Sequence, residues 1–170
     1  RGAARSQLWL IQLEGSGLCF SAASCSRRCT SGSPGSGLCS SQAYNQTMRV
    51  DGILHSSSPE LGSANKVYVR YCSSDAFLGN ASAFGLQFRG QAIVQAVLAD
   101  LVVRRGLGRP RSARGGLAPV ERDVLVLAGS SSGSYGAMAH LDYVPAMLGA
   151  HGARHVHVVG LLDSALVLLE

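Results

Sequence analysis

The chain has 170 residues, of which 46% are hydrophobic and 15% are charged, and its net charge is +5. This length suits one domain with a sizeable core, residues 1–170. No apolar run approaches the roughly 18 residues of a membrane-spanning helix. The basic charge does not favour nucleic-acid binding, because arginines crowd into a Gly/Pro-containing loop at residues 104–119 that has no interleaved aromatic residues for base stacking.

The first short apolar run, residues 8–13, predicts a buried β-strand. It leads into Glu14-Gly15-Ser16-Gly17-Leu18-Cys19, a glycine turn that can expose successive backbone N–H groups toward a cavity. An oxyanion hole needs such N–H groups. Taken alone, however, the turn is more typical of an ordinary flexible connection.

The cysteines point to disulfides rather than to a metal site, because they lack Cys-x-x-Cys spacing and histidine partners. Residues 21–63 are rich in Ser, Gly and Cys, and predict surface loops pinned by disulfides in an oxidising compartment. Glycosylation sequons at Asn45 and Asn80 point the same way, to a secreted or cell-wall protein. The odd count of five cysteines, and a start at Arg1 without a signal-peptide pattern, lead us to expect a truncated chain.

Strands and helices are expected to alternate along the rest of the chain. Residues 66–71 alternate in polarity as a strand does, and residues 89–105 carry a helical apolar stripe closed by basic residues and a glycine. A last strand is expected at residues 155–159, with residues 160–165 at its end. The fold class is therefore α/β, a mostly parallel sheet with helices on both faces and functional residues at the carboxyl ends of the strands.

The most informative stretch is Asp123 to Gly136. Its apolar run, Val124 to Ala128, predicts a buried strand, and Gly129-Ser130-Ser131-Ser132-Gly133 follows before helical spacing begins. Gly-x-Ser-x-Gly between a strand and a helix is the context of a nucleophile elbow. Ser131 is the candidate nucleophile, and the N–H of Ser132 is a candidate oxyanion donor. Because the chain is rich in Gly and Ser, the flanking strand and helix carry this interpretation more than the motif itself.

Five motifs follow one another along the chain: Leu13-Glu14-Gly15 with Gly17 and Cys19, Val69 to Asp75, Phe88-Arg89-Gly90, Leu127 to Gly133, and Leu162 to Ala165. In this order they resemble the pectin acetylesterase/Notum family. The resemblance implies an α/β-hydrolase-type fold and a Ser-Asp-His triad. Plant and microbial members of the family remove acetyl esters from pectin, whereas the animal member Notum removes a fatty acyl ester from Wnt proteins. The resemblance calls for no cofactor and no metal.

Carried over position by position, the resemblance assigns roles to individual residues. The nucleophile falls on Ser131, and the oxyanion donors fall on the backbone of Gly17, Leu18 and Ser132. It implies a disulfide between Cys19 and Cys25 and leaves the pairing of Cys29 and Cys39 open. Cys72 matches a cysteine whose partner lies upstream of Arg1. Asp75 and Asp163 match positions that shape the site.

The sequence departs from the family pattern at several of these positions. Leu18 stands where a tryptophan is usual, and Ser132 and Ser134 stand in an elbow that usually reads Ser-Ala-Gly-Gly. Leu166 and Val167 replace aromatic residues. The family's triad Asp and His fall beyond the equivalent of Glu170, and none of the histidines matches them: His55, His140, His151, His155 and His157. These 170 residues alone are thus expected to be nearly inactive.

The sequence thus predicts a serine carboxylic ester hydrolase that acts on an esterified polysaccharide or an acylated protein. Removal of acetyl esters from a pectin-type polysaccharide is the main interpretation, and a Notum-like removal of palmitoleate is the alternative. A non-catalytic extracellular binding protein on the same scaffold is a rival from another class. A third alternative is a partial chain without a stable fold, because a sheet that lacks its last strands exposes an apolar edge.

Overall fold

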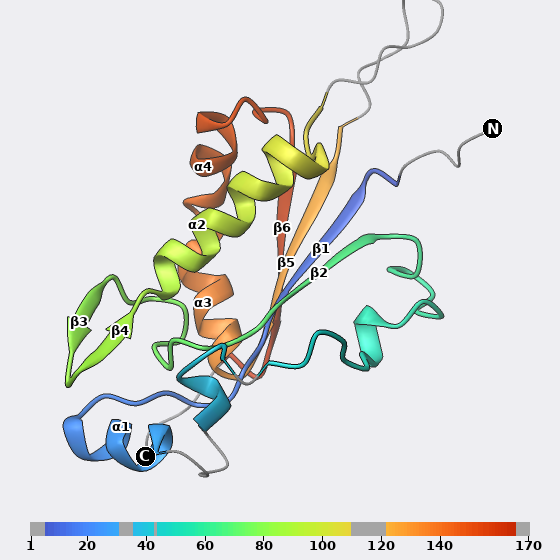
Figure 1. The fold of residues 1–170 in the computed structure, drawn as a ribbon. Coiled ribbons are helices and arrows are strands. Elements are labelled where there is room, and N and C mark those ends of the chain that lie inside the picture. Colours follow the sequence, from blue (N-terminus) through green and yellow to red (C-terminus); the bar gives the residue numbers. More distant parts are fainter. Residues whose placement is uncertain (1–5, 31–35, 43, 110–121, 166–170) are drawn as a thin grey trace, which may run out of the picture.

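The computed structural model describes residues 6–30, 36–42, 44–109 and 122–165 (Figure 1). Their framework is a four-stranded parallel sheet in the order β2-β1-β5-β6. These strands are β1 (Leu8–Leu13), β2 (Asn65–Val69), β5 (Val124–Ser130) and β6 (His157–Asp163). β1 pairs with β2 and β5, and β5 pairs with β6, each in parallel. The expected α/β class with a parallel sheet is confirmed.

The last strand differs from its predicted position. β6 runs over His157–Asp163, so residues 160–163 belong to the strand instead of following it. The reason is pairing: β5 extends to Ser130, and β6 matches it residue by residue up to Gly129 with Leu162 and Ser130 with Asp163. The carboxyl end of β6 therefore lies beside the turn that follows β5.

The helix predicted over residues 89–105 is present. It consists of α2 (Gly90–Asp100) and a π-helical turn (Leu101–Arg105), which ends at Gly106 with a left-handed φ of 80°. Arg104 and Arg105 lie in this last turn and form ion pairs with Asp100 at 3.5 and 3.4 Å. Most of the expected basic loop, residues 110–119, lies outside the described residues.

Two helices follow the central strand. α3 (Ser132–Leu141) begins directly after Ser131, and α4 (Val144–Ala150) follows after a short turn. Pro145 lies in the first turn of α4, where a residue without an N–H donor is tolerated. A short antiparallel hairpin between β2 and α2, β3 (Ala81–Ala83) with β4 (Leu86–Phe88), was not predicted.

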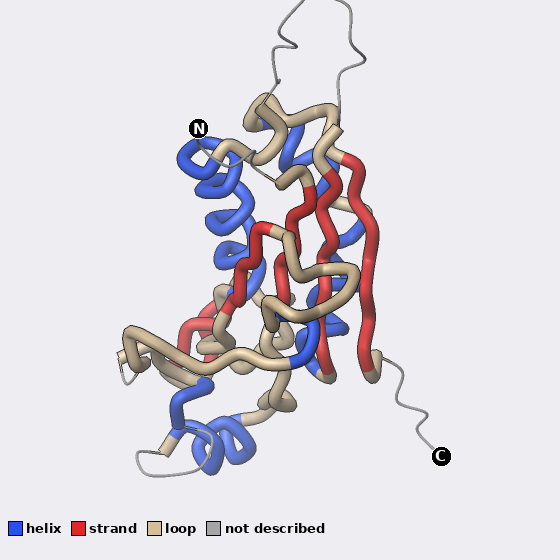
Figure 2. Tube along the Cα trace, turned by 90° about the vertical axis from the view of Figure 1, so that its right-hand side faces the viewer, coloured by secondary structure: helices blue, strands red, loops and turns tan. Residues whose placement is uncertain are grey.

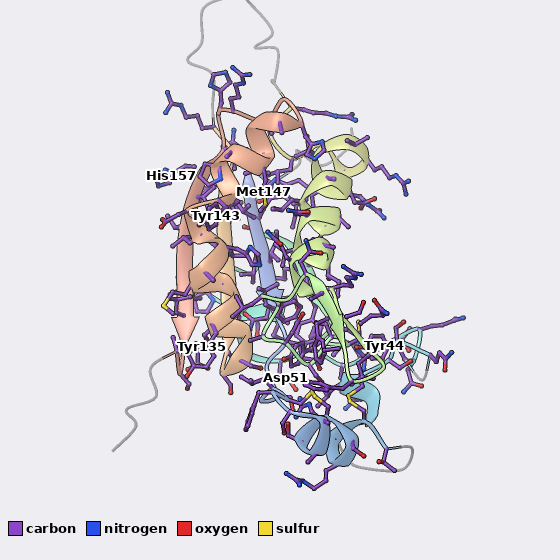
Figure 3. The ribbon with its side chains drawn as sticks, turned by 90° about the vertical axis from the view of Figure 1, so that its left-hand side faces the viewer. Tyr44, Asp51, Tyr135, Tyr143, Met147 and His157 are labelled. Atoms are coloured by element: carbon purple, nitrogen blue, oxygen red, sulfur yellow. A yellow bond between two sulfur atoms is a disulfide. The ribbon has the colours of Figure 1, made fainter. Side chains whose placement is uncertain are left out.

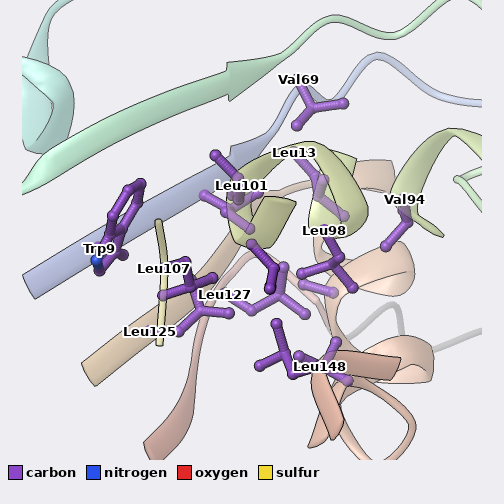
Figure 4. Close-up of a cluster of buried hydrophobic side chains, with 14 of the residues drawn as sticks. Trp9, Leu13, Val69, Val94, Leu98, Leu101, Leu107, Leu125, Leu127 and Leu148 are labelled. Atoms are coloured by element: carbon purple, nitrogen blue, oxygen red, sulfur yellow. The ribbon is translucent and has the colours of Figure 1, made fainter. Parts of the chain in front are cut away.

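The main hydrophobic core lies between the sheet and helices α2, α3 and α4 (Figures 1 and 4). Odd-numbered side chains of β1 and β5 face it, among them Ile11, Leu13 and Leu127, and Leu98 of α2 and Leu148 of α4 close it from the other side. This alternation follows from the period of two along a strand.

Tyr143 and Met147 lie on or beside α4, and His157 is the first residue of β6 (Figure 3).

The opposite face of the sheet is covered differently from the expectation. Its buried side chains, Leu10, Val126 and Ala128, pack against Leu54 and partly buried residues of the segment 50–64. The described part of that segment contains only a short 3-10 helix, Gly52–Leu54. The α-helices of the described residues that pack on the sheet therefore lie on one face, and the expectation of such helices on both faces is wrong for this part of the chain.

The expected loop region at residues 21–63 contains helix α1 (Ala22–Cys29) and two short 3-10 helices. The disulfide Cys29–Cys39 lies within it, and the disulfide Cys19–Cys25 joins it to the turn after β1. Cys72 is not disulfide-bonded. Figure 2 shows the four strands of the sheet side by side, with α1 below their carboxyl ends. The disulfides therefore fix α1 at the same end of the sheet as Ser131.

Candidate active site

Ser131 stands on a sharp turn between the central strand β5 and helix α3. Its backbone has φ 52° and ψ −122°, a conformation that a residue with a Cβ rarely adopts, and its side chain is exposed. The N–H of Ser131 donates to the carbonyl of Asp163 at 2.9 Å, which ties the turn to the end of β6. This strained, exposed serine has the backbone geometry of a nucleophile elbow.

The two glycines of the Gly-x-Ser-x-Gly motif are required by close packing of the backbone. A Cβ at Gly129 would lie 2.6 Å from the nitrogen of Ser134 and closer still to the carbonyl oxygen of Gly133. A Cβ at Gly133 would lie 2.9 Å from the carbonyl carbon of Leu13 and closer still to its oxygen. The motif is therefore a steric necessity of this turn rather than a by-product of a glycine-rich composition.

Ser134 fits where the family usually has glycine. Its side chain is fully buried, and its hydroxyl donates to the main-chain carbonyl oxygens of Gly129, at 2.7 Å, and Asp163. It thereby joins the ends of β5 and β6 beneath Ser131. The departure at this position therefore adds hydrogen bonds within the elbow.

The turn after β1 lies against the elbow. A Cβ at Gly15 would lie 3.2 Å from the Cβ of Ser131, and the N–H of Ser16 donates to the hydroxyl of Ser132 at 2.9 Å. Gly17 has a left-handed φ of 62°. Among the described residues, no group of the chain accepts a hydrogen bond from the N–H of Gly17 or of Leu18. The turn thus carries two uncommitted donors next to the elbow.

Asp75 organises the loop that follows β2. Its carboxylate accepts hydrogen bonds from the Ser73 hydroxyl at 2.6 Å and from three backbone N–H groups, those of Phe77 at 3.0 Å, Gly79 at 3.1 Å and Gly90 at 2.8 Å. These bonds hold the loop to the start of α2. Since its acceptor capacity is spent on the protein, Asp75 acts as an anchor of the loop rather than as a group that reaches a substrate.

Asp163 lies at the carboxyl end of β6, and its carbonyl receives the N–H of Ser131. Its exposed side chain lines a cavity of about 520 Å³ on the face of the sheet away from the helices. The cavity is also lined by Gln12, Met48 to Leu54, Tyr68, Gly129, Ser130 and Leu161. Asp163 therefore links the backbone of the elbow to this cavity.

The described histidines make no contact with Ser131. His140 is buried in α3, where its Nε2 lies 2.7 Å from the carbonyl oxygen of Phe77. His155 and His157 are exposed at the amino end of β6, opposite to the end that holds Ser131, and His55 and His151 are also exposed. Within the described part of the chain, no histidine therefore forms a hydrogen bond with Ser131.

A buried tyrosine connects the elbow with its neighbours, and the sequence alone did not point to it. Tyr71 is fully buried, and its hydroxyl accepts the N–H of Ala76 at 2.6 Å. Burial raises the pKa of Tyr71 to about 12, against the influence of hydrogen bonds from Ala76 and the Ser132 side chain. Ser132 thus contacts both Tyr71 and Ser16, which no spacing rule reveals because the three residues lie far apart in the chain.

Three of the five tyrosines are expected to ionise at a higher pH than an ordinary tyrosine. Burial raises the pKa of Tyr68 and of Tyr71 to about 12, and burial with the nearby Cys72 raises the pKa of Tyr44 further. Since the folded state holds these protons more tightly than the unfolded state, the free energy of unfolding falls as pH rises from about 10 to about 12. Urea unfolding across this range and phenolate absorbance test this. Native tyrosines that all ionise together near pH 10 would contradict it.

Neither a metal site nor a membrane span is found within the described ranges. No group of three His, Cys, Asp or Glu residues there is arranged to hold a metal ion. No helix in this part of the chain is long and apolar enough to cross a membrane.

A parallel sheet whose central strand turns through a strained serine into a helix defines an α/β-hydrolase-like fold. The family described as pectinacetylesterase matches residues 2–168, and the chain belongs to this family. Among curated relatives, the palmitoleoyl-protein carboxylesterase notum2 of Xenopus laevis is 35% identical over 164 residues, which are 94% of this chain and 30% of that protein. Pectin acetylesterase 5 of Arabidopsis thaliana is 34% identical over 81% of this chain and 30% of its own length.

A solved structure agrees with the family assignment. The Wnt deacylase Notum from Drosophila superimposes with a TM-score of 0.75 at 33% identity, over 91% of this chain and 42% of that one. The chain therefore spans about a third of the length of the curated relatives that it matches.

Proposed function

We propose that the full-length protein is a carboxylic ester hydrolase in which Ser131 is the nucleophile. The observation that carries the proposal is the geometry of Ser131, an exposed serine at a φ of 52° between the central strand and a helix. Strain of this kind at a polar, exposed residue is typical of active sites. Membership in a family whose relatives are named carboxylesterases and acetylesterases supports the same activity.

In the proposed reaction, a histidine elsewhere in the full-length protein takes the proton of Ser131, and the serine oxygen attacks the ester carbonyl. The negative charge that develops on the carbonyl oxygen is stabilised by the N–H groups of Gly17, Leu18 and Ser132. Collapse of the intermediate releases the alcohol, which takes the proton, and leaves the acyl group on Ser131. Water then hydrolyses this acyl-enzyme to the free acid.

The choice of substrate rests on different observations. The family match favours acetyl esters on a pectin-type polysaccharide. A long acyl chain on a protein is the second candidate. It is favoured by apolar residues exposed beside the first turn, Leu18 at 43% and Phe20 at 79%, and by the Notum relatives. Either substrate places the protein outside the cell or in the cell wall, which agrees with its two disulfides.

The test is hydrolysis by the full-length protein, offered p-nitrophenyl acetate, acetylated pectin and an O-palmitoleoylated serine peptide. Turnover of p-nitrophenyl acetate supports the esterase. Preferential release of acetate from pectin, or of palmitoleate from the peptide, then identifies the substrate class. A folded full-length protein that hydrolyses none of the three would overturn the proposal in favour of a binding protein on the same scaffold.

A further inference from the structure

Arg28 reaches from helix α1 to the turn that follows β1. Its Nε donates to the hydroxyl of Ser74 at 2.8 Å. One terminal nitrogen donates to the carbonyl of Ser16 and lies 3.5 Å from the carbonyl oxygen of Gly17. The guanidinium carbon also lies 5.9 Å from the centroid of the Tyr71 ring. One side chain therefore contacts two successive carbonyls of the turn and the loop beside it.

These contacts determine where the N–H groups of the turn point. In a trans peptide the C=O and the N–H of one peptide plane point in opposite directions, and the described residues contain no cis peptide. Because the carbonyl of Ser16 points to Arg28, the N–H of Gly17 points away from it. The same holds for the carbonyl of Gly17 and the N–H of Leu18. Arg28 thus orients the two N–H groups of the turn that no described acceptor takes.

Neighbouring contacts fix the rest of the turn. The N–H of Ser16 is held by the Ser132 hydroxyl at 2.9 Å, and the N–H of Cys19 donates to the carbonyl of Ser74 at 3.0 Å. Between these two committed groups, only the N–H groups of Gly17 and Leu18 remain available. Arg28 binds the hydroxyl of Ser74, whose carbonyl holds Cys19. It therefore supports the turn both directly and through this loop.

The helix that carries Arg28 is itself well anchored. Ser21 caps α1 in a capping box with Ser24. The disulfides Cys19–Cys25 and Cys29–Cys39 tie the middle and the last residue of the helix to the surrounding chain. Because the helix is already held in place, the Arg28 guanidinium loses little further conformational entropy when it binds the turn. This favours a single, fixed arrangement of its contacts with the turn.

We propose that Arg28 is a positioning residue of the oxyanion hole, which sets the direction of the Gly17 and Leu18 N–H groups by holding the carbonyls that precede them. The inference rests on the proposed esterase function. It does not make Arg28 a catalytic residue, because its guanidinium contacts the turn and not the reacting atoms. Its effect belongs to the transition state, in which the oxyanion carries its full charge.

The test compares Arg28→Gln and Arg28→Lys with wild type in the full-length protein. Arg27→Gln is the matched control, because Arg27 is the adjacent arginine of α1, is exposed and makes no described contact with the turn. For each protein, kcat and KM for p-nitrophenyl acetate are measured per active site, counted by complete reaction with a fluorophosphonate. The inhibition constant of a trifluoromethyl ketone, which forms a tetrahedral adduct, is measured beside them.

For Arg28→Gln we expect kcat to fall by about 10²-fold, as on loss of one oxyanion donor, with KM little changed. The inhibition constant should rise in parallel with the loss of kcat/KM. The kcat of Arg28→Lys should lie between those of wild type and Arg28→Gln, because a lysine ammonium keeps the positive charge but lacks the several N–H donors of a guanidinium. Arg27→Gln should behave as wild type.

A purely structural role would lower thermal stability and the titratable fraction but leave kcat per active site unchanged, and that result overturns the inference. A rise in KM alone also overturns it. If Arg28→Gln does not fold, Arg28→Lys is judged by the same criteria. An inactive wild type would instead refute the esterase proposal itself, so the two failures are distinguishable.

Discussion

Replacing Ser131 with alanine in the full-length protein is expected to lower kcat for p-nitrophenyl acetate by about 10⁴-fold or more. The substitution removes the atom that attacks the ester, and the oxyanion donors alone sustain only weak residual catalysis. Thermal unfolding should change little, because alanine keeps a Cβ at the same φ of 52° and the strain of the turn persists. Steady-state kinetics and a thermal melt measure both effects.

Ser26→Ala is a suitable control for this experiment. Ser26 is exposed on α1, and no described contact joins its hydroxyl to the elbow. The control should keep the wild-type kcat. Wild-type activity in Ser131→Ala would mean that another residue is the nucleophile and that the elbow has a purely structural role.

Replacing Gly15 with alanine is expected to cause a large loss of stability. A Cβ at Gly15 would lie 2.8 Å from the carbonyl carbon of Ser130 and nearer still to its oxygen. These are backbone atoms of a central strand that pairs on both sides, so they yield only at a cost. We expect the free energy of unfolding to fall by about 3 kcal/mol or more, and activity to fall because the turn and the elbow are pushed apart.

Gly37→Ala provides the matched comparison. Gly37 lies in a short 3-10 helix, and an added Cβ there meets no atom of the described residues within 4 Å. Urea unfolding of both variants should show a large shift for Gly15→Ala and almost none for Gly37→Ala. Equal stability of the two variants would show that the first turn does not pack against the elbow as described.

Local signals predicted much of the fold correctly. The apolar runs of β1 and β5 mark buried strands, and the glycine pair around Ser131 marks a turn in which a Cβ would meet backbone atoms. Both signals are carried by consecutive residues. These signals were therefore sufficient to predict that Ser131 lies at the carboxyl end of a central strand.

Features that depend on pairing or on distant contacts were missed or displaced. The bounds of β6 follow from its register with β5, which its own residues do not specify. The hairpin β3–β4 has strands of only three residues, too short for a periodic signal. The contacts of Arg28 and Tyr71 join residues that lie far apart in the chain. These contacts appear only once the chain has folded.

Covalent labelling tests whether Ser131 is an activated nucleophile. The full-length protein is treated with a fluorophosphonate, digested and mapped by mass spectrometry. We expect one phosphonate on the peptide that contains Ser131, and none in Ser131→Ala. A folded, hydrolytically active protein whose Ser131 stays unlabelled while another residue is modified would contradict it.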